Sequence, residues 1–159
     1  MEKTTKISEI KRNWHLIDAK EKILGRLATQ ITPLLLGKNK PYFVKNLDCG
    51  DFVVVINARY VKVTGRKAEQ KTYSSYSGYP AGQRIRKYSQ LIEEHPDRII
   101  INAVSGMLPD NKLKARWLGK LHVFPENEHK FNDKFMPKAK RQDEKVTKET
   151  KGTKLKENK

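Results

Sequence analysis

The stretch "DFVVVINA", residues 51 to 58, decides the fold of this 159-residue chain. Its centre is an unbroken apolar run from Phe52 to Ile56. A strand with one face in water alternates apolar and polar side chains, whereas a strand covered on both faces is apolar throughout. The stretch therefore predicts a strand inside a sheet that is sandwiched between helices, which is an α/β fold.

The segments before this stretch add a strand and a helix. "WHLI", residues 14 to 17, has the aromatic and branched side chains of a short strand, and Asp18 follows as a possible helix N-cap. A helical i, i+3, i+4, i+7 spacing then predicts an amphipathic helix that ends before Gly37, and we expect Pro33 to bend its last turn. Its apolar residues are Leu24, Leu27, Ala28, Ile31, Leu34 and Leu35.

The segments after it are more varied. "YVKVTG", residues 60 to 65, alternates like a half-buried strand, and "KTYSSYSGYP", residues 71 to 80, predicts an extended segment that breaks at Gly78 and Pro80. Residues 83 to 95 have one apolar stripe and are expected to be helical. Residues 111 to 121 predict a short helix, and "LHVFP", residues 121 to 125, predicts a closing strand. For "RIIINAV", residues 98 to 104, β-branched residues favour a strand while Pro96 suits the start of a helix, so the residues alone leave both open.

The charge of the chain points to a polyanionic partner. Lys and Arg number 34 against 18 Asp and Glu, a formal charge of +16. Residues 132 to 159 hold ten Lys or Arg and five Asp or Glu, a charge of +5, so the other +11 belongs to residues 1 to 131. A surface with this imbalance attracts nucleic acid. The Lys-, Glu- and Thr-rich residues 132 to 159 have almost nothing to bury, and we expect them to be disordered in the free protein.

Several classes of function lack their residues. Cys49 is the only cysteine, which excludes an internal disulfide framework and a cysteine-rich zinc site. No apolar run approaches the roughly 20 residues of a membrane span, and the first 14 residues resemble no leader peptide. We therefore expect a cytoplasmic protein that does not associate with a membrane. Neither a P-loop nor a dinucleotide-binding glycine turn is present, and we expect no cofactor and no small-molecule substrate.

No catalytic or metal site is assembled in the sequence. The histidines, which are His15, His95, His122 and His129, are far apart and do not have the spacing of metal ligands. A thiol nucleophile at Cys49 with one of them is conceivable, but a packed cysteine at a strand entry is favoured. We therefore expect no catalytic residue and no metal.

"YSSYSGYPAGQRIRK", residues 73 to 87, has the composition of a nucleic-acid-binding loop. Arginine and lysine neutralise phosphates, tyrosine rings stack on bases or riboses, and glycine allows close approach of the backbone. Tyr73 is equally well explained as a strand residue that packs on a neighbour. Tyr79, Arg84, Arg86 and Lys87 are harder to explain as core residues.

Three motifs, in this order and spacing, resemble the large-subunit ribosomal protein L13 family, also called uL13. They are "INARYVKVTGRK" (56 to 67), "YSGYPAGQ" (76 to 83) and "VSGMLPDNKL" (104 to 113), and the similarity extends from about Trp14 to Phe131. "GMLPDN" is more similar to the bacterial form. The chain departs from the family at Ala81-Gly82, where two glycines are common, and in its long Lys-rich C-terminal end.

The resemblance implies a three-layer α/β/α domain with a mainly parallel central sheet. It also implies a helix over residues 97 to 107, in place of the strand that propensity favours. The domain organisation expected is an N-terminal extension (1 to 13), an rRNA-binding domain (14 to 131) and a disordered basic C-terminal extension (132 to 159). The implied function is that of a structural constituent of the large (50S) subunit, which binds 23S rRNA and supports assembly without catalysis.

Within this interpretation, the partners are large-subunit rRNA and neighbouring ribosomal proteins, and the location is the cytoplasmic ribosome. Two alternatives stay open. The protein could be a free RNA-binding regulator, or an enzyme that acts on nucleic acid through Cys49, a histidine or Asp51. The predicted RNA-binding residues combine those that match the family's basic and aromatic surface with their basic neighbours. They are Lys38, Lys40, Lys45, Arg66, Lys67, Lys71, Tyr76, Tyr79, Arg84, Arg86, Lys87, Lys112, Lys114, Arg116 and Lys120.

Overall fold

The computed structural model of the protein describes residues 6–135, and the predictions for the rest of the C-terminal extension lie outside them. Two compact units divide the chain, Met1–His129 and Lys130–Lys159. Within the described residues the second unit contributes the short helix α6 (Asn132–Phe135). The first unit begins with a short 3-10 helix, η1 (Ile7–Glu9), and contains the sheet and the other helices.

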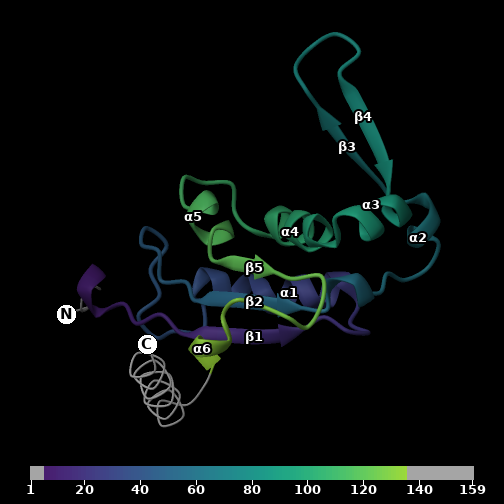
Figure 1. The fold of residues 1–159 in the computed structure, drawn as a ribbon. Helices are drawn as coiled ribbons and strands as arrows, with labels where there is room; N and C mark the ends of the chain where they lie inside the picture. Colours follow the sequence, from purple (N-terminus) through teal and green to yellow (C-terminus); the bar gives the residue numbers. More distant parts are fainter. Residues whose placement is uncertain (1–5, 136–159) are drawn as a thin grey trace, which may run out of the picture. The chain divides into compact units, whose positions relative to one another are not determined.

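A three-stranded parallel sheet forms the centre of the first unit (Figure 1). Its order is β1 (Trp14–Asp18), β2 (Phe52–Ile56) and β5 (Leu121–Val123), with Trp14 opposite Phe52 and Val53 opposite Leu121. The middle strand is the apolar run that opened the sequence, and Val53 to Ile56 are all buried. The predicted α/β fold with a mainly parallel sheet is confirmed.

Two long helices supply most of the core around the sheet. α1 (Leu24–Leu36) packs against β2 and against α4 (Pro96–Met107). α1 ends at Gly37, whose φ of 79° is left-handed and therefore suits glycine, and Pro33 lies in its last turn as expected. The predicted helix over residues 97 to 107 is confirmed as α4: Pro96 takes the first position, and Ile99, Ile100 and Val104 are buried on one face.

The segment of residues 60 to 65 is not a strand, contrary to the sequence prediction. Asn57 has a φ of 60°, and this turn leads into a 3-10 helix, η2 (Ala58–Tyr60). Within residues 60 to 65 the only ladder contact is the isolated bridge between Lys62 and Ile23. Val61 is nonetheless buried, so the alternating pattern reflects side-chain packing on the core without strand pairing.

The predicted helix over residues 83 to 95 is wrong in its first part. Residues Gln83–Lys87 form β4, which pairs antiparallel with β3 (Thr72–Tyr76), and helix α3 (Tyr88–Glu94) begins only afterwards. α2 (Lys67–Gln70) precedes this hairpin. The tight turn brings the two extended segments into register, and Tyr88 and Leu91 then bury the apolar stripe that had suggested a longer helix.

Three smaller boundaries also differ from the predictions. Asp18 ends β1 and does not cap α1, whose N-cap position is Ile23; its carboxylate accepts hydrogen bonds from the Lys20 backbone N–H and the Asn57 side chain, both at 2.9 Å. The helix expected over residues 111 to 121 is shorter, α5 (Lys114–Leu118), because a turn at Asn111 precedes it. β5 stops at Val123, two residues before the predicted end.

Candidate nucleic-acid interface

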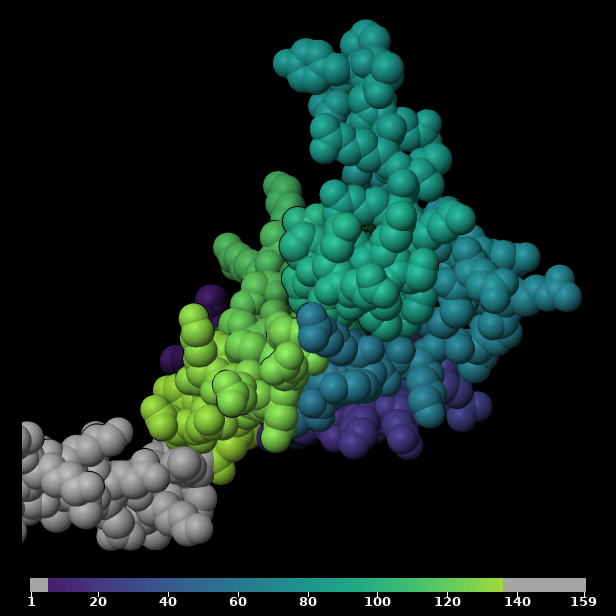
Figure 2. Space-filling view, turned by 45° about the vertical axis from the view of Figure 1, so that its right-hand side comes forward, coloured from purple at the N-terminus to yellow at the C-terminus, as the bar shows by residue number. Residues whose placement is uncertain are grey.

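The β3–β4 hairpin presents the aromatic and basic residues of the loop that the sequence singled out. Figure 2 shows it as a narrow arm that stands clear of the helices beneath it. Tyr76 and Tyr79 are 68% and 76% exposed. Gly78 and Ala81, at φ 89° and 60°, form the turn, and the φ of Ala81 is a strained backbone conformation for a residue other than glycine. The tip therefore offers two exposed rings on a tight turn.

Pairing in the hairpin sorts its side chains onto two faces. Tyr73 lies opposite Arg86 and Ser75 lies opposite Arg84, so these four share one face. On this face a hollow of about 220 Å³ is lined by Arg84, Arg86 and also Arg98 of α4. Arg86 donates to Glu94 at 3.0 Å, whereas the described residues offer Arg84 and Arg98 no carboxylate within ion-pair distance. The hollow is thus a site of positive charge.

The base of the hairpin is fixed by two tyrosines that are not available for stacking. The Tyr88 hydroxyl donates to the Val61 carbonyl at 3.2 Å, and the Tyr88 backbone N–H donates to the Lys71 carbonyl. Burial raises the pKa of both Tyr73 and Tyr88 above the ordinary value. Lys71 lies 5.1 Å above the Tyr73 ring. The packing explanation considered for Tyr73 is therefore the one that the structure supports.

The loop between α1 and β2 carries two exposed lysines and one buried one. Lys38 and Lys45 are exposed. Lys40 is only 11% exposed in its side chain, and its ammonium group donates to Asp51, to the Lys11 carbonyl at 2.7 Å and to the Cys49 carbonyl at 2.8 Å. Lys40 was predicted to contact RNA, but all three of its donors are already used inside the protein.

Asp51 is the centre of this buried cluster. Its carboxylate also accepts from the Asn13 backbone N–H at 2.8 Å and from His15 Nε2 at 3.0 Å. Burial acts to raise the pKa of Asp51, but the hydrogen bonds from Lys40, Asn13 and His15 outweigh it and hold the pKa below its ordinary value. The cluster ties the N-terminal ends of β1 and β2 to the basic loop. Asp51 is buried and accepts three hydrogen bonds within the protein, which argues against its use as a catalytic base.

Lys120 is a second predicted RNA-binding residue that the structure places in the interior. Its side chain is 9% exposed, and the ammonium group donates to Asp48 at 2.6 Å and to the Gly50 carbonyl at 3.2 Å. Burial lowers the pKa of Lys120, and the nearby Asp48 carboxylate partly offsets this effect. Lys120 therefore fastens the loop to β5 and is not presented to solvent.

The remaining predicted cations are at the surface in two groups. Lys67 and Lys71 line a hollow of about 260 Å³ that also includes Met107, and Arg66 is exposed beside them. At the other end of α4, Lys112 and Arg116 are exposed, while Lys114 forms an ion pair with Asp110. This hollow, the hollow at the hairpin and a third one beside Lys38 and Lys45 are each lined in part by α4 or the residues just after it, so α4 borders the separate basic segments.

Sequence reasoning missed Arg98, Phe43, Met107, Asn111 and Trp117. The last four of these residues line a cavity of about 460 Å³, to which Lys38 and Lys45 also contribute. Arg98 joins the arginines of the hairpin only because residues 98 to 104 are helical. No sequence signal predicted that Phe43 and Trp117 line one cavity, because these residues belong to segments far apart in the chain.

The described part of the chain has no assembled metal site, membrane-spanning helix or accessible thiol. Residues 6–135 contain no group of three metal-ligating side chains and no helix long and apolar enough to cross a membrane. Cys49 is fully buried, and its thiol donates to the Tyr42 carbonyl. A buried, hydrogen-bonded thiol cannot reach a substrate, which argues against the nucleophile that the sequence left open.

Comparison with known proteins identifies relatives over most of the chain. The sequence profile of the family described as "Ribosomal protein L13" matches residues 12–130. A protein of Prochlorococcus marinus subsp. pastoris is 52% identical over 126 residues, which are 79% of this chain and 88% of the relative. One of Rubrobacter xylanophilus is 51% identical over 121 residues, 76% and 85% of the two chains. One of Chloroflexus aggregans is 49% identical over 124 residues, 78% and 87%. All three are named "Large ribosomal subunit protein uL13".

Proposed function

This chain belongs to the ribosomal protein L13 family, and we propose that it is a structural constituent of the large ribosomal subunit, where it binds large-subunit rRNA and supports assembly. The family is one of ribosomal proteins and not of enzymes, in agreement with the expectation from the sequence. Its partners are the rRNA and the ribosomal proteins beside it, and its place is the cytoplasmic ribosome.

The observation that carries this proposal is the alignment of basic segments along α4. The hairpin, the segment around Lys67 and the loop with Lys38 and Lys45 are separate in the sequence, and each borders a hollow that α4 or the residues just after it also line. A folded surface that holds several basic segments in fixed positions can neutralise phosphates from more than one RNA segment at once. Binding in this way fixes those RNA segments relative to one another, which is what a structural ribosomal protein contributes to assembly.

The residues proposed to contact RNA directly are the exposed members of the predicted set. They are Lys38, Lys45, Arg66, Lys67, Tyr76, Tyr79, Arg84, Arg86, Lys87, Lys112 and Arg116, and we add Arg98. Lys71 and Lys114 are half-buried and contribute positive charge at the edge of the proposed RNA-binding surface. Lys40 and Lys120 act indirectly, because their bonds to Asp51 and Asp48 hold the basic loop in place.

We also propose the finer architecture, a three-layer α/β/α domain in the assembled particle. Val53 and Val55 belong to the core with α1, whereas Val54 points to the other face of β2 and is fully buried as well. Burial on both faces is the pattern that a sheet covered on two sides requires. Backbone amide hydrogen exchange of the assembled subunit tests this: slow exchange over the central strand β2 is expected, and fast exchange over β2 would contradict cover on both faces.

The first experiment is sedimentation of tagged protein from the lysate of its own cells, in gradients at high and at low magnesium concentration. The protein is expected with the intact ribosome at high magnesium and with the large-subunit peak when low magnesium separates the subunits. Protein that stays in the light fractions in both gradients would overturn the proposal in favour of a free RNA-binding regulator. Migration with the small subunit would contradict the assignment to the large one.

A further inference from the structure

We propose that the cavity between the basic loop and the segment after α4 receives one unstacked rRNA nucleotide, with its base inside and its phosphate against Lys38 and Lys45. The inference rests on the proposed function, since it needs the chain to bind rRNA. It adds a specific recognition site to the general attraction between the basic surface and phosphates.

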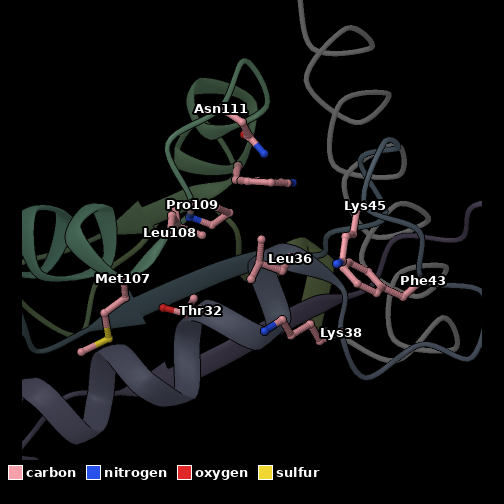
Figure 3. Close-up of a pocket in the computed structure, with 10 residues that line it drawn as sticks. Thr32, Leu36, Lys38, Phe43, Lys45, Met107, Leu108, Pro109 and Asn111 are labelled. Atoms are coloured by element: carbon pink, nitrogen blue, oxygen red, sulfur yellow. The ribbon is translucent and has the colours of Figure 1, made fainter.

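The walls of the cavity come from three separate parts of the chain. Figure 3 shows Phe43 and Lys45 on one side, Leu108, Pro109 and Asn111 on the other, and Leu36 of α1 between them. The volume of about 460 Å³ lies in the range of roughly 300–1,000 Å³ that is typical of small-ligand sites. Phe43 and Trp117 provide aromatic rings, and apolar side chains form most of the remaining wall. Flat apolar surfaces of this kind accept the face of a nucleobase.

The polar groups at this cavity are hydrogen-bond donors in need of acceptors. Trp117 is only 3% exposed, yet its indole Nε1–H has no acceptor among the described residues, although the side chain lines the cavity. A buried donor without a partner is costly, and an acceptor brought to the cavity by a ligand would remove that cost. The Asn111 carboxamide oxygen already accepts from the Leu113 and Lys114 backbone N–H groups, which leaves its amino group as a further donor.

The charge of the cavity selects among possible occupants. Lys38 and Lys45 are exposed at its edge, and no carboxylate is among the lining residues of the described chain. A nucleotide satisfies all of these groups, because its base offers carbonyl and ring-nitrogen acceptors and its phosphate offers negative charge. An apolar side chain from a neighbouring protein would fill the volume but leave the indole N–H and both ammonium groups without partners.

The direct experiment is ultraviolet cross-linking of large subunits that contain the full chain, followed by mass spectrometry of its peptides. Nucleotide adducts are expected on the peptides with Phe43 and Trp117. Adducts confined to the hairpin peptides with Tyr76 and Tyr79 would overturn the cavity site while leaving rRNA binding intact. An adduct between the cavity residues and a peptide of a neighbouring protein would also overturn it.

A variant that fills the cavity gives an independent measurement. Met107 is 45% exposed at the cavity wall, so Met107→Trp should fold and obstruct the site, and Leu16→Trp is the matched control at the same 45% exposure on β1. Loss of one stacked base predicts affinity for purified large-subunit rRNA about tenfold lower for Met107→Trp. The base of one rRNA nucleotide should also become reactive to chemical probes.

Wild-type affinity and an unchanged probing pattern for Met107→Trp would overturn the inference. If the unaltered chain itself fails to bind the rRNA, the proposed function falls, and the cavity site falls with it. The two failures are therefore distinguished by the behaviour of the wild-type protein.

Discussion

At the scale of single residues, the role of a lysine in this protein depends on whether a carboxylate reaches it. Lys38 and Lys40 are two residues apart in one basic loop, yet the first faces solvent and the second is bonded to Asp51 in the interior. An ammonium group taken out of water must be paired and hydrogen-bonded, and Lys40 satisfies this with three acceptors. The composition of the loop therefore overstates the charge that it presents to RNA.

Replacing Asp51 with asparagine is expected to destabilise the protein by about 3–5 kcal/mol, because Lys40 then stays buried without its counter-charge. The free energy of unfolding in urea measures the effect. Asp110→Asn is the control, since Asp110 pairs with Lys114 while 89% exposed and should cost less than about 1 kcal/mol. Equal losses in the free energy of unfolding for the two variants would show that the buried ion pair stabilises the protein no more than the exposed one.

The lowered pKa of Asp51 also makes the stability of the folded protein depend on pH in acid. The pKa of Asp51 is lower in the folded protein than its ordinary value of 3.8, so the unfolded chain binds a proton more readily. The stabilisation is complete well above pH 3.8 and is lost as the pH falls through the lower folded pKa. Thermal melts between about pH 6 and pH 3 should show a steeper loss for the wild type than for Asp51→Asn. Parallel curves would contradict this role of Asp51.

At the scale of elements, the hairpin and the basic loop reach their positions through backbone geometry. Gly50 is the clearest case. A side-chain carbon at this position would lie 1.8 Å from the Leu35 carbonyl oxygen, because the chain passes against the end of α1 as it enters β2. A glycine is required here by the close approach of two backbones.

Gly50→Ala is therefore expected to destabilise the protein, by about 1–3 kcal/mol or more, because α1 and the strand entry must move apart. Gly25→Ala in the first turn of α1 is the matched control: no atom lies within 4 Å of the added carbon, and alanine favours the helix by up to about 1 kcal/mol. Unfolding in urea of both variants distinguishes a steric clash from a general effect of the methyl group. A neutral Gly50→Ala would refute the close approach.

The double variant Arg84→Glu with Arg86→Glu is expected to weaken rRNA binding without unfolding the protein, since both residues are exposed. If each arginine contacts one phosphate, the slope of log affinity against log salt should flatten by roughly 1.4–1.8. Filter binding at several salt concentrations measures both quantities, and circular dichroism checks the fold.

The control for this variant is Lys20→Glu with Lys22→Glu, which makes the same change in net charge at the exposed turn after β1. It should lower affinity much less than the hairpin variant. Equal effects of the two variants would mean that total charge, and not the hairpin, determines binding.

At the scale of the whole molecule, positive charge extends beyond the folded unit. The C-terminal residues 132 to 159 carry +5 of the total +16. We predict that these residues, most of which lie outside the described range, are disordered in the free protein and become partly ordered on rRNA. The energetic reason for the prediction is that this composition cannot bury enough apolar surface to offset chain entropy, whereas a polyanion supplies compensating contacts.

Limited proteolysis tests this prediction for the C-terminal extension. Trypsin is expected to cut residues 132 to 159 of the free protein before it cuts the sheet and helices, and rRNA should slow these cuts. A cleavage rate that is the same in the free and the rRNA-bound protein would contradict ordering on RNA. The internal sites at Arg84 and Arg86 serve as a second reporter in the same digest, because protection there monitors binding of the hairpin.

The sequence by itself determined the class of the fold, most of the elements and the kind of partner. An unbroken apolar run needs cover on both faces, a 3.6-residue spacing needs a helix, and a charge of +16 needs a polyanion, all of which are properties of local pattern or total composition. The three family motifs, which no property of composition supplies, added helix α4 where β-propensity favoured a strand.

Only the tertiary structure decided which basic residues are free and where a cavity lies. Lys120 and Asp48 are 72 residues apart in the sequence, and the cavity-lining residues Phe43 and Trp117 are similarly far apart, so no local pattern predicts that these residues come together. The hairpin was missed because its β4 segment is followed directly by α3, so the helix predicted from the apolar stripe of α3 was extended over β4. Pairing partners and burial depend on the path of the whole chain, which brings distant segments together along α4.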